Sequence, residues 1–369
     1  MYATRRRMMA ASGLALLVLT SAWSALRAAA ADPHTAGVAA AKRTVQLPVT
    51  HAEALTLMDA ASGRILHSVN GDRQMRIASL TKIMTAIVAI EHGRLDDIVT
   101  VSARAAYKEG SSIYLRPGDK VPLETLLYGL MLRSGNDAAT AIAEHVGGSE
   151  EGFVFLMNRK AEEIGLSDTR FANPHGLDQP EHYSTANDLA KLTAYAMRNP
   201  VFRKIAATKF KTFPNPNGGW DYHFRNKNKM LFRYEGADGV KTGYTRLARR
   251  CLVSSATRNG QQLIAVTLND GNDWEDHRRL LDYGFAAFPL EEVFAEGQRM
   301  EGLPYEAAAA FRYPFAAGER EKLRALFQPF PPDSPEYRFG LRGRLTFELD
   351  GRVIGSVPMR EAADRARPG

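Results

Sequence analysis

Two hairpin patterns, one at each end of a long helical block, constrain the fold of this chain more than any other feature. In the first, residues 54–58 and 64–68 flank a glycine-containing turn. In the second, apolar runs at residues 251–257 and 262–268 flank an Asn-Gly dipeptide, which is typical of tight hairpins. A helix is expected next, over residues 274–285. This order predicts an α/β (α+β) fold in which one antiparallel sheet takes strands from both ends of the domain and carries helices on its faces.

The block between the hairpins shows the apolar period of helices. The segment from Ser79 to His92 carries Ile83, Ile87 and other apolar residues on one stripe and stops before Gly93, a residue type favoured after a helix end. This stripe predicts a central, buried helix. Further helices are expected over residues 123–132, 138–145, 152–164 and 186–198. The aromatic residues Tyr195, Trp220, Phe285 and Phe288 are expected in the core rather than in a cleft.

The composition is that of a globular protein. The 369 residues are 45% hydrophobic and 24% charged, and this length corresponds to about two domains. The formal net charge is +7, but four of the 48 basic residues lie in the first 31 positions, which contain no acid, so 44 basic residues face 41 acidic ones in the rest of the chain. Without a Lys/Arg-rich block, a nucleic-acid partner is not expected.

The first residues have the pattern of an export signal. Three arginines at positions 5–7 precede an apolar run over residues 8–25 and small residues at 28–31. This pattern predicts a signal peptide over residues 1–31, followed by a linker over 32–49, and places the mature chain in the periplasm. The alternative is an uncleaved segment that tethers the chain to the inner membrane. The single cysteine, Cys251, leaves no intramolecular disulfide to stabilise the exported fold.

The character of the chain changes near residue 289. Prolines punctuate short runs, and residues 344–349 alternate strictly between polar and apolar before a turn at Asp350-Gly351. We therefore expect a catalytic domain over residues 50–288, a small all-β domain over 289–360 and a polar tail over 361–369.

A serine and a lysine three residues apart begin the central helix. The spacing of Ser79 and Lys82 puts the hydroxyl and the amine on one helix face. A serine needs a base to become nucleophilic. A lysine buried in apolar surroundings has a lowered pKa, which suits it to this role. Taken alone, the pattern is common and favours an N-cap serine with a surface lysine.

Two further motifs give this pair a chemical setting. Ser134-Gly135-Asn136 follows an expected helix, and Lys241-Thr242-Gly243 leads into the second hairpin. A hydroxyl and an amide between helices can relay a proton and hold a carbonyl, whereas a strand that carries Lys, Thr and Gly offers charge, a hydroxyl and open backbone to a substrate carboxylate. In this order, the three motifs are the signature of penicillin-binding proteins and class A β-lactamases.

Beyond the motifs, residues 50–288 resemble the low-molecular-mass penicillin-binding D-alanyl-D-alanine carboxypeptidases. Four further segments carry this resemblance. They are Phe171-Ala172-Asn173-Pro174-His175-Gly176-Leu177-Asp178, Tyr183-Ser184-Thr185-Ala186-Asn187-Asp188, Asn226-Lys227-Asn228 and Gly236-Ala237-Asp238-Gly239-Val240. The resemblance implies the serine β-lactamase/penicillin-binding protein fold, and residues after Pro289 are similar, more weakly, to the β-sandwich domain that follows it in that family.

The resemblance also implies roles for individual residues. Ser79 is expected to be the acylated nucleophile, Lys82 its general base and Ser134 a proton relay. The substrate-binding residues are expected to be Asn136 for the substrate amide, Lys241, Thr242 and Gly243 for the terminal carboxylate, and the backbone N–H of Tyr244 with that of Ser79 for the oxyanion. No metal and no organic cofactor is expected, since the histidines lack metal-binding spacing.

The function implied is a serine D,D-carboxypeptidase that removes the terminal D-Ala from pentapeptide stems of peptidoglycan and is acylated by β-lactam antibiotics. A D,D-endopeptidase of the same family is the nearest alternative. The other is a penicillin- or peptidoglycan-binding protein with little turnover, which the departure at Arg249-Arg250 leaves open, since the family usually has a small residue followed by Gly there. The polar tail lacks the amphipathic anchoring helix common in the family, so no C-terminal membrane anchor is expected.

Three residues suggest other mechanisms, and the sequence favours structural roles for each. His175 and Asp178 invite a triad with Ser79, but both fall in the turn-rich segment shared with the family. Glu163 is the only counterpart of the glutamate that frees class A β-lactamases from penicillin. Its position at the end of an expected helix favours a surface residue instead.

Overall fold

The computed structural model describes residues 45–362. Contacts divide them into two compact units, one reaching to Pro289 and the other beginning at Leu290. The expected signal peptide, most of the linker and the tail after residue 362 lie outside the described residues. Within residues 45–362, we find no helix that is both long and apolar enough to cross a membrane.

A five-stranded antiparallel sheet organises the first unit, in the order β2-β1-β9-β8-β7. Its strands are β1 (Ala52–Asp59), β2 (Ile65–Val69), β7 (Ala237–Thr245), β8 (Arg249–Arg258) and β9 (Gln261–Asp270). The first hairpin pairs with the second through β1 and β9, with Ala52 opposite Asp270. The prediction of one antiparallel sheet built from both ends of the domain is therefore confirmed.

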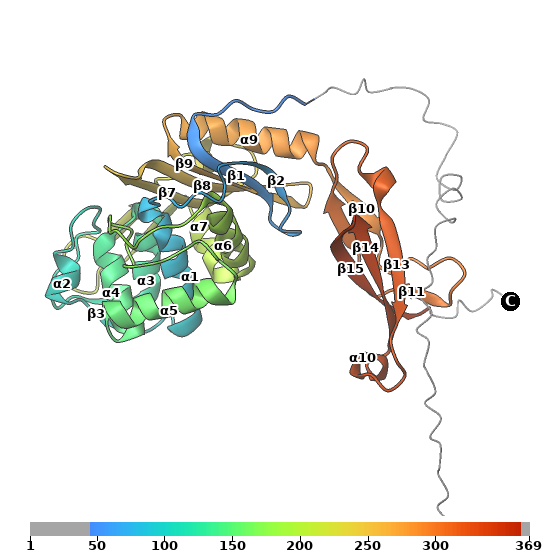
Figure 1. Cartoon of the computed structure of the whole chain (residues 1–369). Helices are drawn as coiled ribbons and strands as arrows, with labels where there is room; N and C mark the ends of the chain where they lie inside the picture. Colours follow the sequence, from blue (N-terminus) through green and yellow to red (C-terminus); the bar gives the residue numbers. More distant parts are fainter. Residues whose placement is uncertain (1–44, 363–369) are drawn as a thin grey trace, which may run out of the picture. The chain divides into compact units, whose positions relative to one another are not determined.

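Helices cover both faces of this sheet (Figure 1). On one face lies α9 (Asp273–Ala287), and on the other lies the helical block, where α6 and α7 pack on the strands. The block contains α1 (Lys82–His92), α2 (Ala103–Ala106), α3 (Leu123–Tyr128), α4 (Asn136–Gly147), α5 (Glu150–Glu163), α6 (Ala186–Arg198) and α7 (Pro200–Ala207), and the short α8 (Met230–Arg233) precedes β7. Residues Lys82 to Ala89 of α1 are all buried, so this helix is central, as its apolar stripe predicts.

The helical block also contains elements that the sequence pattern did not predict. Two small antiparallel pairs are β3 (Ile98–Thr100) with β4 (Lys120–Pro122) and β5 (Phe210–Phe213) with β6 (Tyr222–Arg225). The helix expected over 123–132 changes at Gly129 into a wider π-helical turn, η3 (Gly129–Arg133). The helix expected from Ser79 opens with a tighter 3-10 turn, η2 (Ala78–Thr81). Both irregular turns lie next to expected site residues, where such turns are frequent.

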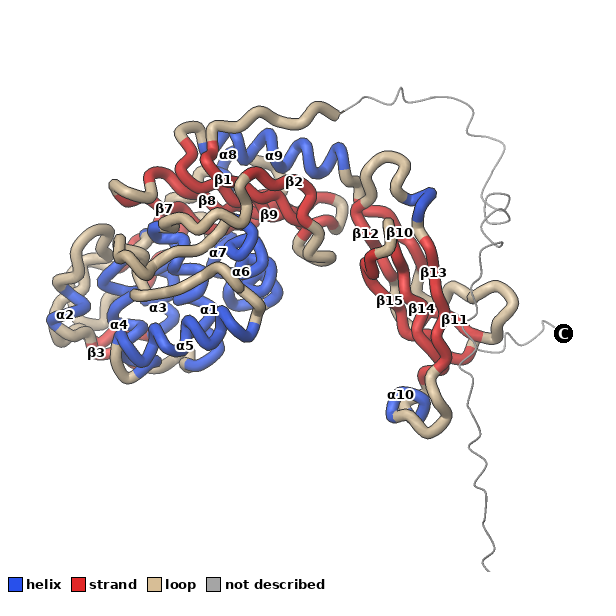
Figure 2. Tube along the Cα trace, in the orientation of Figure 1, coloured by secondary structure: helices blue, strands red, loops and turns tan. Residues whose placement is uncertain are grey.

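The second unit is built on strands joined by loops, with one short helix, α10 (Pro335–Arg338), and a 3-10 turn, η4 (Arg320–Lys322) (Figure 2). A four-stranded sheet has the order β11-β15-β14-β13, and β10 pairs with β12. The strands are β10 (Leu290–Phe294), β11 (Tyr305–Ala307), β12 (Phe311–Pro314), β13 (Arg324–Pro329), β14 (Leu341–Leu349) and β15 (Arg352–Glu361). The β14–β15 hairpin turns at Asp350-Gly351, where both residues have a positive φ, as the alternating pattern predicts. A small all-β region at the C-terminus is therefore confirmed.

Candidate active site

Ser79 lies in the 3-10 turn η2, where α1 begins. The residue before it, Ala78, has a left-handed φ of 47°. The segment that contains Gly176 packs directly on this turn, and a Cβ atom at Gly176 would lie 1.9 Å from the backbone oxygen of Ala78. Gly176 has a φ of 86°, so both its conformation and this close approach require glycine. The turn that contains Ser79 thus packs on the loop that contains Gly176, nearly a hundred residues further along the chain.

The amine of Lys82 is completely buried and has three oxygen neighbours. Its Nζ atom lies 3.0 Å from Ser79 Oγ, 2.7 Å from Asn136 Oδ1 and 2.6 Å from the backbone oxygen of His175. Burial, together with the charges of Lys241 and Lys227, lowers the pKa of Lys82 well below its usual value. The site therefore favours the neutral amine.

This arrangement also orients the neutral amine. Asn136 Oδ1 and the His175 carbonyl oxygen can only accept hydrogen bonds, so they take the two N–H groups of the amine. The orientation of the Asn136 amide is fixed because its Nδ2 donates to the backbone oxygen of Glu109 at 2.6 Å. The lone pair of Lys82 Nζ is then left for the hydroxyl proton of Ser79, which is the geometry of a general base.

Ser134 lies between η3 and α4 and turns toward the strand β7. It adopts a left-handed φ of 65°, a conformation that non-glycine residues reach at a cost and that is frequent at functional sites. Its Oγ accepts a hydrogen bond from Lys241 Nζ at 3.1 Å. Lys241 Nζ also donates to the backbone oxygen of Thr242 at 2.9 Å. Burial, with a smaller effect of Lys227, lowers the pKa of Lys241 to about 7.

The strand β7 brings the third motif against the nucleophile. It is an edge strand of the five-stranded sheet, so one side of its backbone is not paired within that sheet. A Cβ atom at Gly243 would lie 3.2 Å from the backbone nitrogen of Ser79 and equally close to the oxygen of Ile77. Glycine at this position therefore lets the strand approach the turn of Ser79. Tyr244, the next residue, is 61% exposed.

These elements enclose a cleft of about 410 Å³. It is lined by Ser79, Ser111, Ser134, Lys227, Thr242, Gly243, Tyr244, Arg250, Cys251, Asp273 and Trp274. Lys82, Asn136 and Lys241 are buried next to the residues that form its wall. The structure thus brings all eight expected site residues together from three separate parts of the chain.

Arg250, at the departure from the family pattern, also lines the cleft. Its guanidinium forms an ion pair with Asp273, with Nε donating to Oδ2 at 3.1 Å. Arg249, its neighbour, is exposed and has a φ of 60°. The departure therefore adds a paired cation to the edge of the cleft and leaves the cleft itself in place.

Two residues of the site were missed by the sequence reasoning. The carboxylate of Asp137 is fully buried and accepts hydrogen bonds from the backbone N–H groups of Ile113 and Leu115, at 3.0 to 3.2 Å. Lys227 lines the cleft and donates to Ser111 Oγ at 3.2 Å. The position of Asp137 directly after Asn136 was the signal available for it, and the Asn226-Lys227-Asn228 segment was the signal for Lys227.

The residues that suggested other mechanisms lie in structural positions. His175 offers its backbone oxygen to Lys82, whereas its ring lies 3.6 Å from Glu150. Asp178 accepts a hydrogen bond from Thr245 at 3.0 Å. Glu163 is bound to Lys160 on the surface of α5. The interpretation of these three as structural residues agrees with these contacts.

Trp220 is a correction to the sequence analysis. Its side chain is 91% exposed in the β5–β6 loop and lines a cavity, so it is not a core residue. Tyr195, by contrast, packs partly buried against the core. The aromatic residue type alone did not distinguish the two positions.

A serine within hydrogen-bond distance of a buried lysine three residues further along, beside an edge strand that carries lysine and threonine, is the arrangement typical of serine peptidases of the penicillin-binding kind. Residues 41–272 match the model of peptidase family S11, described as D-alanyl-D-alanine carboxypeptidase. The chain belongs to this family.

Curated relatives extend the similarity over most of the chain. D-alanyl-D-alanine carboxypeptidase DacC of Escherichia coli is 34% identical over 349 residues, which are 87% of this chain and 86% of the relative. DacF of Bacillus subtilis is 35% identical over 265 residues, covering 70% of this chain and 68% of the relative. The longer match includes the second unit.

Solved structures show the same fold. Penicillin binding protein 5 from Haemophilus influenzae matches with a TM-score of 0.71 and 29% identity, covering 86% of this chain and 98% of that chain. The D-alanyl-D-alanine carboxypeptidase DacD from Francisella tularensis matches with a TM-score of 0.68 and 27% identity, covering 89% of this chain and 98% of that chain. The penicillin-binding protein fold expected from the sequence is confirmed.

Proposed function

We propose that this protein removes the terminal D-Ala from peptidoglycan pentapeptide stems and that Ser79 carries the acyl group during the reaction. The observation that carries the proposal is the buried amine of Lys82, 3.0 Å from Ser79 Oγ, with its two other neighbours both acceptors. No metal or organic cofactor takes part in the steps below.

Acylation begins with transfer of the Ser79 hydroxyl proton to Lys82 Nζ. The oxygen then attacks the carbonyl carbon of the penultimate D-Ala, and the oxyanion is held by the backbone N–H groups of Ser79 and Tyr244. Ser134, hydrogen-bonded to Lys241 at 3.1 Å, relays the proton taken up by Lys82 to the leaving D-Ala amine as the peptide bond breaks, so that Lys82 is neutral again and Ser134 keeps its hydroxyl. Water attacks the ester in the second half of the reaction, releasing the shortened stem and restoring the Ser79 hydroxyl.

Substrate orientation is assigned to the edge of β7 and to Asn136. A peptide that lies along an edge strand gains backbone hydrogen bonds, and its end is then close to the lysine and threonine of the third motif. Lys241 and Thr242 would bind the terminal carboxylate, and Asn136 would bind the substrate amide. The site of action we propose is the periplasm, reached by export through the signal at residues 1–31.

The test combines two substrates and penicillin. Purified protein incubated with muropeptides should release D-Ala from pentapeptide stems and leave cross-linked dimers intact; cleavage of the dimers instead would identify a D,D-endopeptidase. Ser79→Ala should abolish both D-Ala release and acylation by labelled penicillin. A burst of acylation without turnover of a D-Ala-D-Ala peptide would contradict the proposed carboxypeptidase and favour the binding protein with little turnover.

The lifetime of the penicillin adduct separates this activity from a β-lactamase. Because Glu163 is bound to Lys160 on the surface, no dedicated base is assigned to the attack of water on the penicilloyl ester. Intact-mass spectrometry after brief exposure to penicillin should show an adduct on the Ser79 peptide that persists for minutes or longer. Rapid loss of the adduct, slowed by Glu163→Gln, would instead indicate a β-lactamase.

A further inference from the structure

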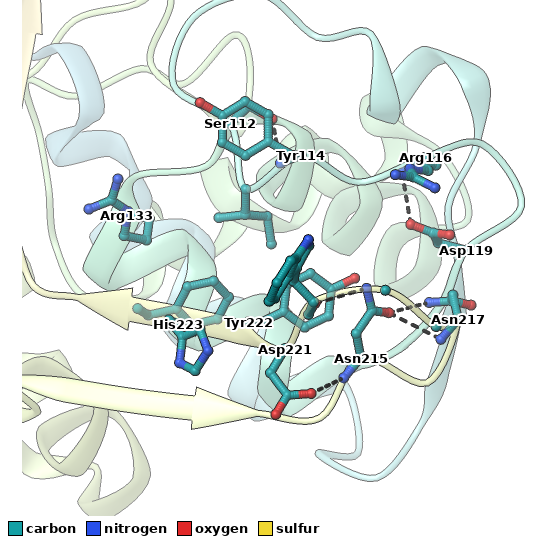
Figure 3. Close-up of a pocket in the computed structure, with 15 residues that line it drawn as sticks. Ser112, Tyr114, Arg116, Asp119, Arg133, Asn215, Asn217, Asp221, Tyr222 and His223 are labelled. Carbon is teal, nitrogen blue, oxygen red and sulfur yellow. Dashed lines mark hydrogen bonds between the residues drawn. The ribbon is translucent and has the colours of Figure 1, made fainter.

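A second cavity, of about 420 Å³, adjoins the catalytic cleft. It lies between the loop of residues 112–116 and the tip of the β5–β6 hairpin, and Figure 3 shows side chains from both segments facing it. The two sites share a border along the chain. Ser111 lines the catalytic cleft, and its neighbour Ser112 lines the cavity. In the same way, Ser134 lines the cleft and its neighbour Arg133 lines the cavity. We call this second site the aromatic cavity.

Two large aromatic side chains stand in the aromatic cavity with nearly all of their surface exposed. Trp220 is 91% exposed and Tyr114 is 85% exposed, although each would be stabilised by burial. Beneath them, Tyr222 and Phe224 are buried and stacked on each other at 5.8 Å. Exposed aromatic surface inside a concavity is typical of a place where a ligand with a flat apolar face binds.

Hydrogen bonds hold the backbone at both aromatic residues in place. Asn217 ties the hairpin tip to the strand β4, because its Oδ1 accepts from the backbone N–H of Lys120 at 2.8 Å. Asn215 Nδ2 donates to the backbone oxygen of Trp220 at 3.4 Å. On the other side, the backbone N–H of Tyr114 donates to Ser112 Oγ at 2.7 Å, and Ser112 in turn donates to the buried carboxylate of Asp137. Because the backbone is ordered in advance, less conformational entropy is lost from these loops when a ligand binds.

The polar groups around the aromatic rings have balanced charge. Arg116 and Arg133 contribute two cations, and Asp119 and Asp221 contribute two carboxylates. Asparagine side chains add amide donors and acceptors to this rim. Balanced charge gives no advantage to a polyanion or a polycation. The combination of flat apolar surface and many uncharged donors and acceptors fits a sugar ring, which has apolar C–H faces and hydroxyl and amide edges.

The reach of the substrate connects this cavity to the reaction, and this step rests on the proposed function. In a pentapeptide stem, four residues separate the scissile bond from the sugar that carries the stem, and four extended residues span roughly 13–14 Å. The loop from Ser111 to Tyr114 leads from the catalytic cleft into the aromatic cavity over three residues, at most about 11 Å of chain. The Asn136 amide that we assign to the substrate also donates to the backbone oxygen of Glu109, two residues before this loop. A stem that leaves the cleft along this loop therefore brings its sugar to the cavity.

We propose that the aromatic cavity binds the saccharide to which the stem peptide is attached, with Trp220 and Tyr114 as stacking surfaces. The protein then recognises its substrate at two points, the D-Ala-D-Ala end in the cleft and the sugar in the cavity. It should prefer a pentapeptide that is still attached to its disaccharide over the same pentapeptide in free form.

Steady-state kinetics with this matched substrate pair tests the proposal. Trp220→Ala should lower kcat/KM for the disaccharide-pentapeptide by about five- to tenfold, which corresponds to the loss of one aromatic stacking contact. Its kcat/KM for the free pentapeptide and its rate of acylation by penicillin should be unchanged. Trp220→Phe, which keeps a flat ring, should retain most of the preference, whereas Trp220→Leu, which keeps apolar surface without a ring, should lose it. Phe155→Ala removes another exposed aromatic residue, 63% exposed on α5, and should have no effect.

Binding of peptide-free glycan strands provides a second measurement that does not depend on turnover. The strands should change the fluorescence of the wild-type protein, and this change should be lost in Trp220→Phe, which lacks the indole. Equal use of both substrates by the wild type would mean that the cavity does not bind the sugar, and equal losses of Trp220→Ala on the free and the sugar-linked pentapeptide would mean that it binds the peptide. Either result overturns the saccharide proposal but leaves the carboxypeptidase intact. If the wild-type protein released D-Ala from neither substrate, the proposed function itself would fail.

Discussion

The two units of the molecule bury different kinds of side chain. Among the described residues from Leu290 onward, the buried side chains are all apolar or aromatic, with Phe311 and Phe347 stacked 4.8 Å apart beside them. The catalytic unit instead buries three lysines, Lys82, Lys160 and Lys241, together with carboxylates such as Asp137. Buried cations cost free energy unless they are paired or lose their charge. The comparison teaches that the core of the second unit is purely apolar, whereas the catalytic unit gives up stability to hold reactive groups.

Loss of the base is the largest effect expected. Lys82→Arg keeps a cation but cannot release its proton at neutral pH, so the rate of acylation by penicillin should fall at least a hundredfold. Stopped-flow or gel-based acylation with labelled penicillin measures this rate. If the variant kept a tenth of the wild-type rate, Lys82 would not be the base.

A substitution in the core of the second unit should have the opposite effect, a loss of stability without a loss of catalysis. Phe347→Ala removes a buried ring and should destabilise that unit by about 3–5 kcal/mol, seen as faster amide exchange in β14 and β15. Acylation of Ser79 should stay at the wild-type rate, since this unit carries none of the residues of the catalytic cleft. A loss of acylation in this variant, with the first unit still folded, would mean that the two units are not independent.

The pH dependence of stability should distinguish the two kinds of core. The folded-state pKa of Lys82 is lowered, so the unfolded chain binds the proton more readily and the unfolding free energy of the catalytic unit should rise as pH rises toward the ordinary lysine value. In Lys82→Met this rise should be smaller but still present, because Lys241, with its pKa of about 7, contributes in the same direction. Urea titrations at a series of pH values measure the slope, and Phe347→Ala should leave it unaltered. An unchanged slope in Lys82→Met would contradict the lowered pKa.

The smallest effect concerns the second lysine. In the free enzyme, Lys241 loses its charge as pH rises through about 7, so binding of the substrate carboxylate should weaken and kcat/KM should decline on the alkaline side. Lys241→Arg remains charged, and its kcat/KM, although lower overall, should show no such decline. Comparing the two pH profiles on the same D-Ala-D-Ala peptide checks this. The same alkaline decline in both proteins would assign it to another group.

The sequence predicted the sheet and the motif residues because both depend on local patterns. Period-2 apolar runs with turn residues identified the hairpins, and three short motifs identified Ser79, Lys82, Ser134 and Lys241. The features it missed depend on contacts between distant segments. The His175 group that touches Lys82 is a backbone carbonyl, which every residue type carries, and the exposure of Trp220 follows from a hairpin whose position is set by Asn217 and Lys120.

The pairing of β1 with β9 also determines when this enzyme is assembled. Ala52 and Asp270 are partners across the middle of the sheet, so β1 has no neighbour on that side until almost the whole catalytic unit is available. Contacts so distant in sequence slow folding, because a long loop must close before any of them forms. Ser79 and Lys82 are therefore present in the chain long before β7 and β9 complete the cleft around them. The nascent chain should be unable to react with penicillin until its second hairpin has paired with β1. The time at which penicillin labelling begins therefore measures the last step of folding.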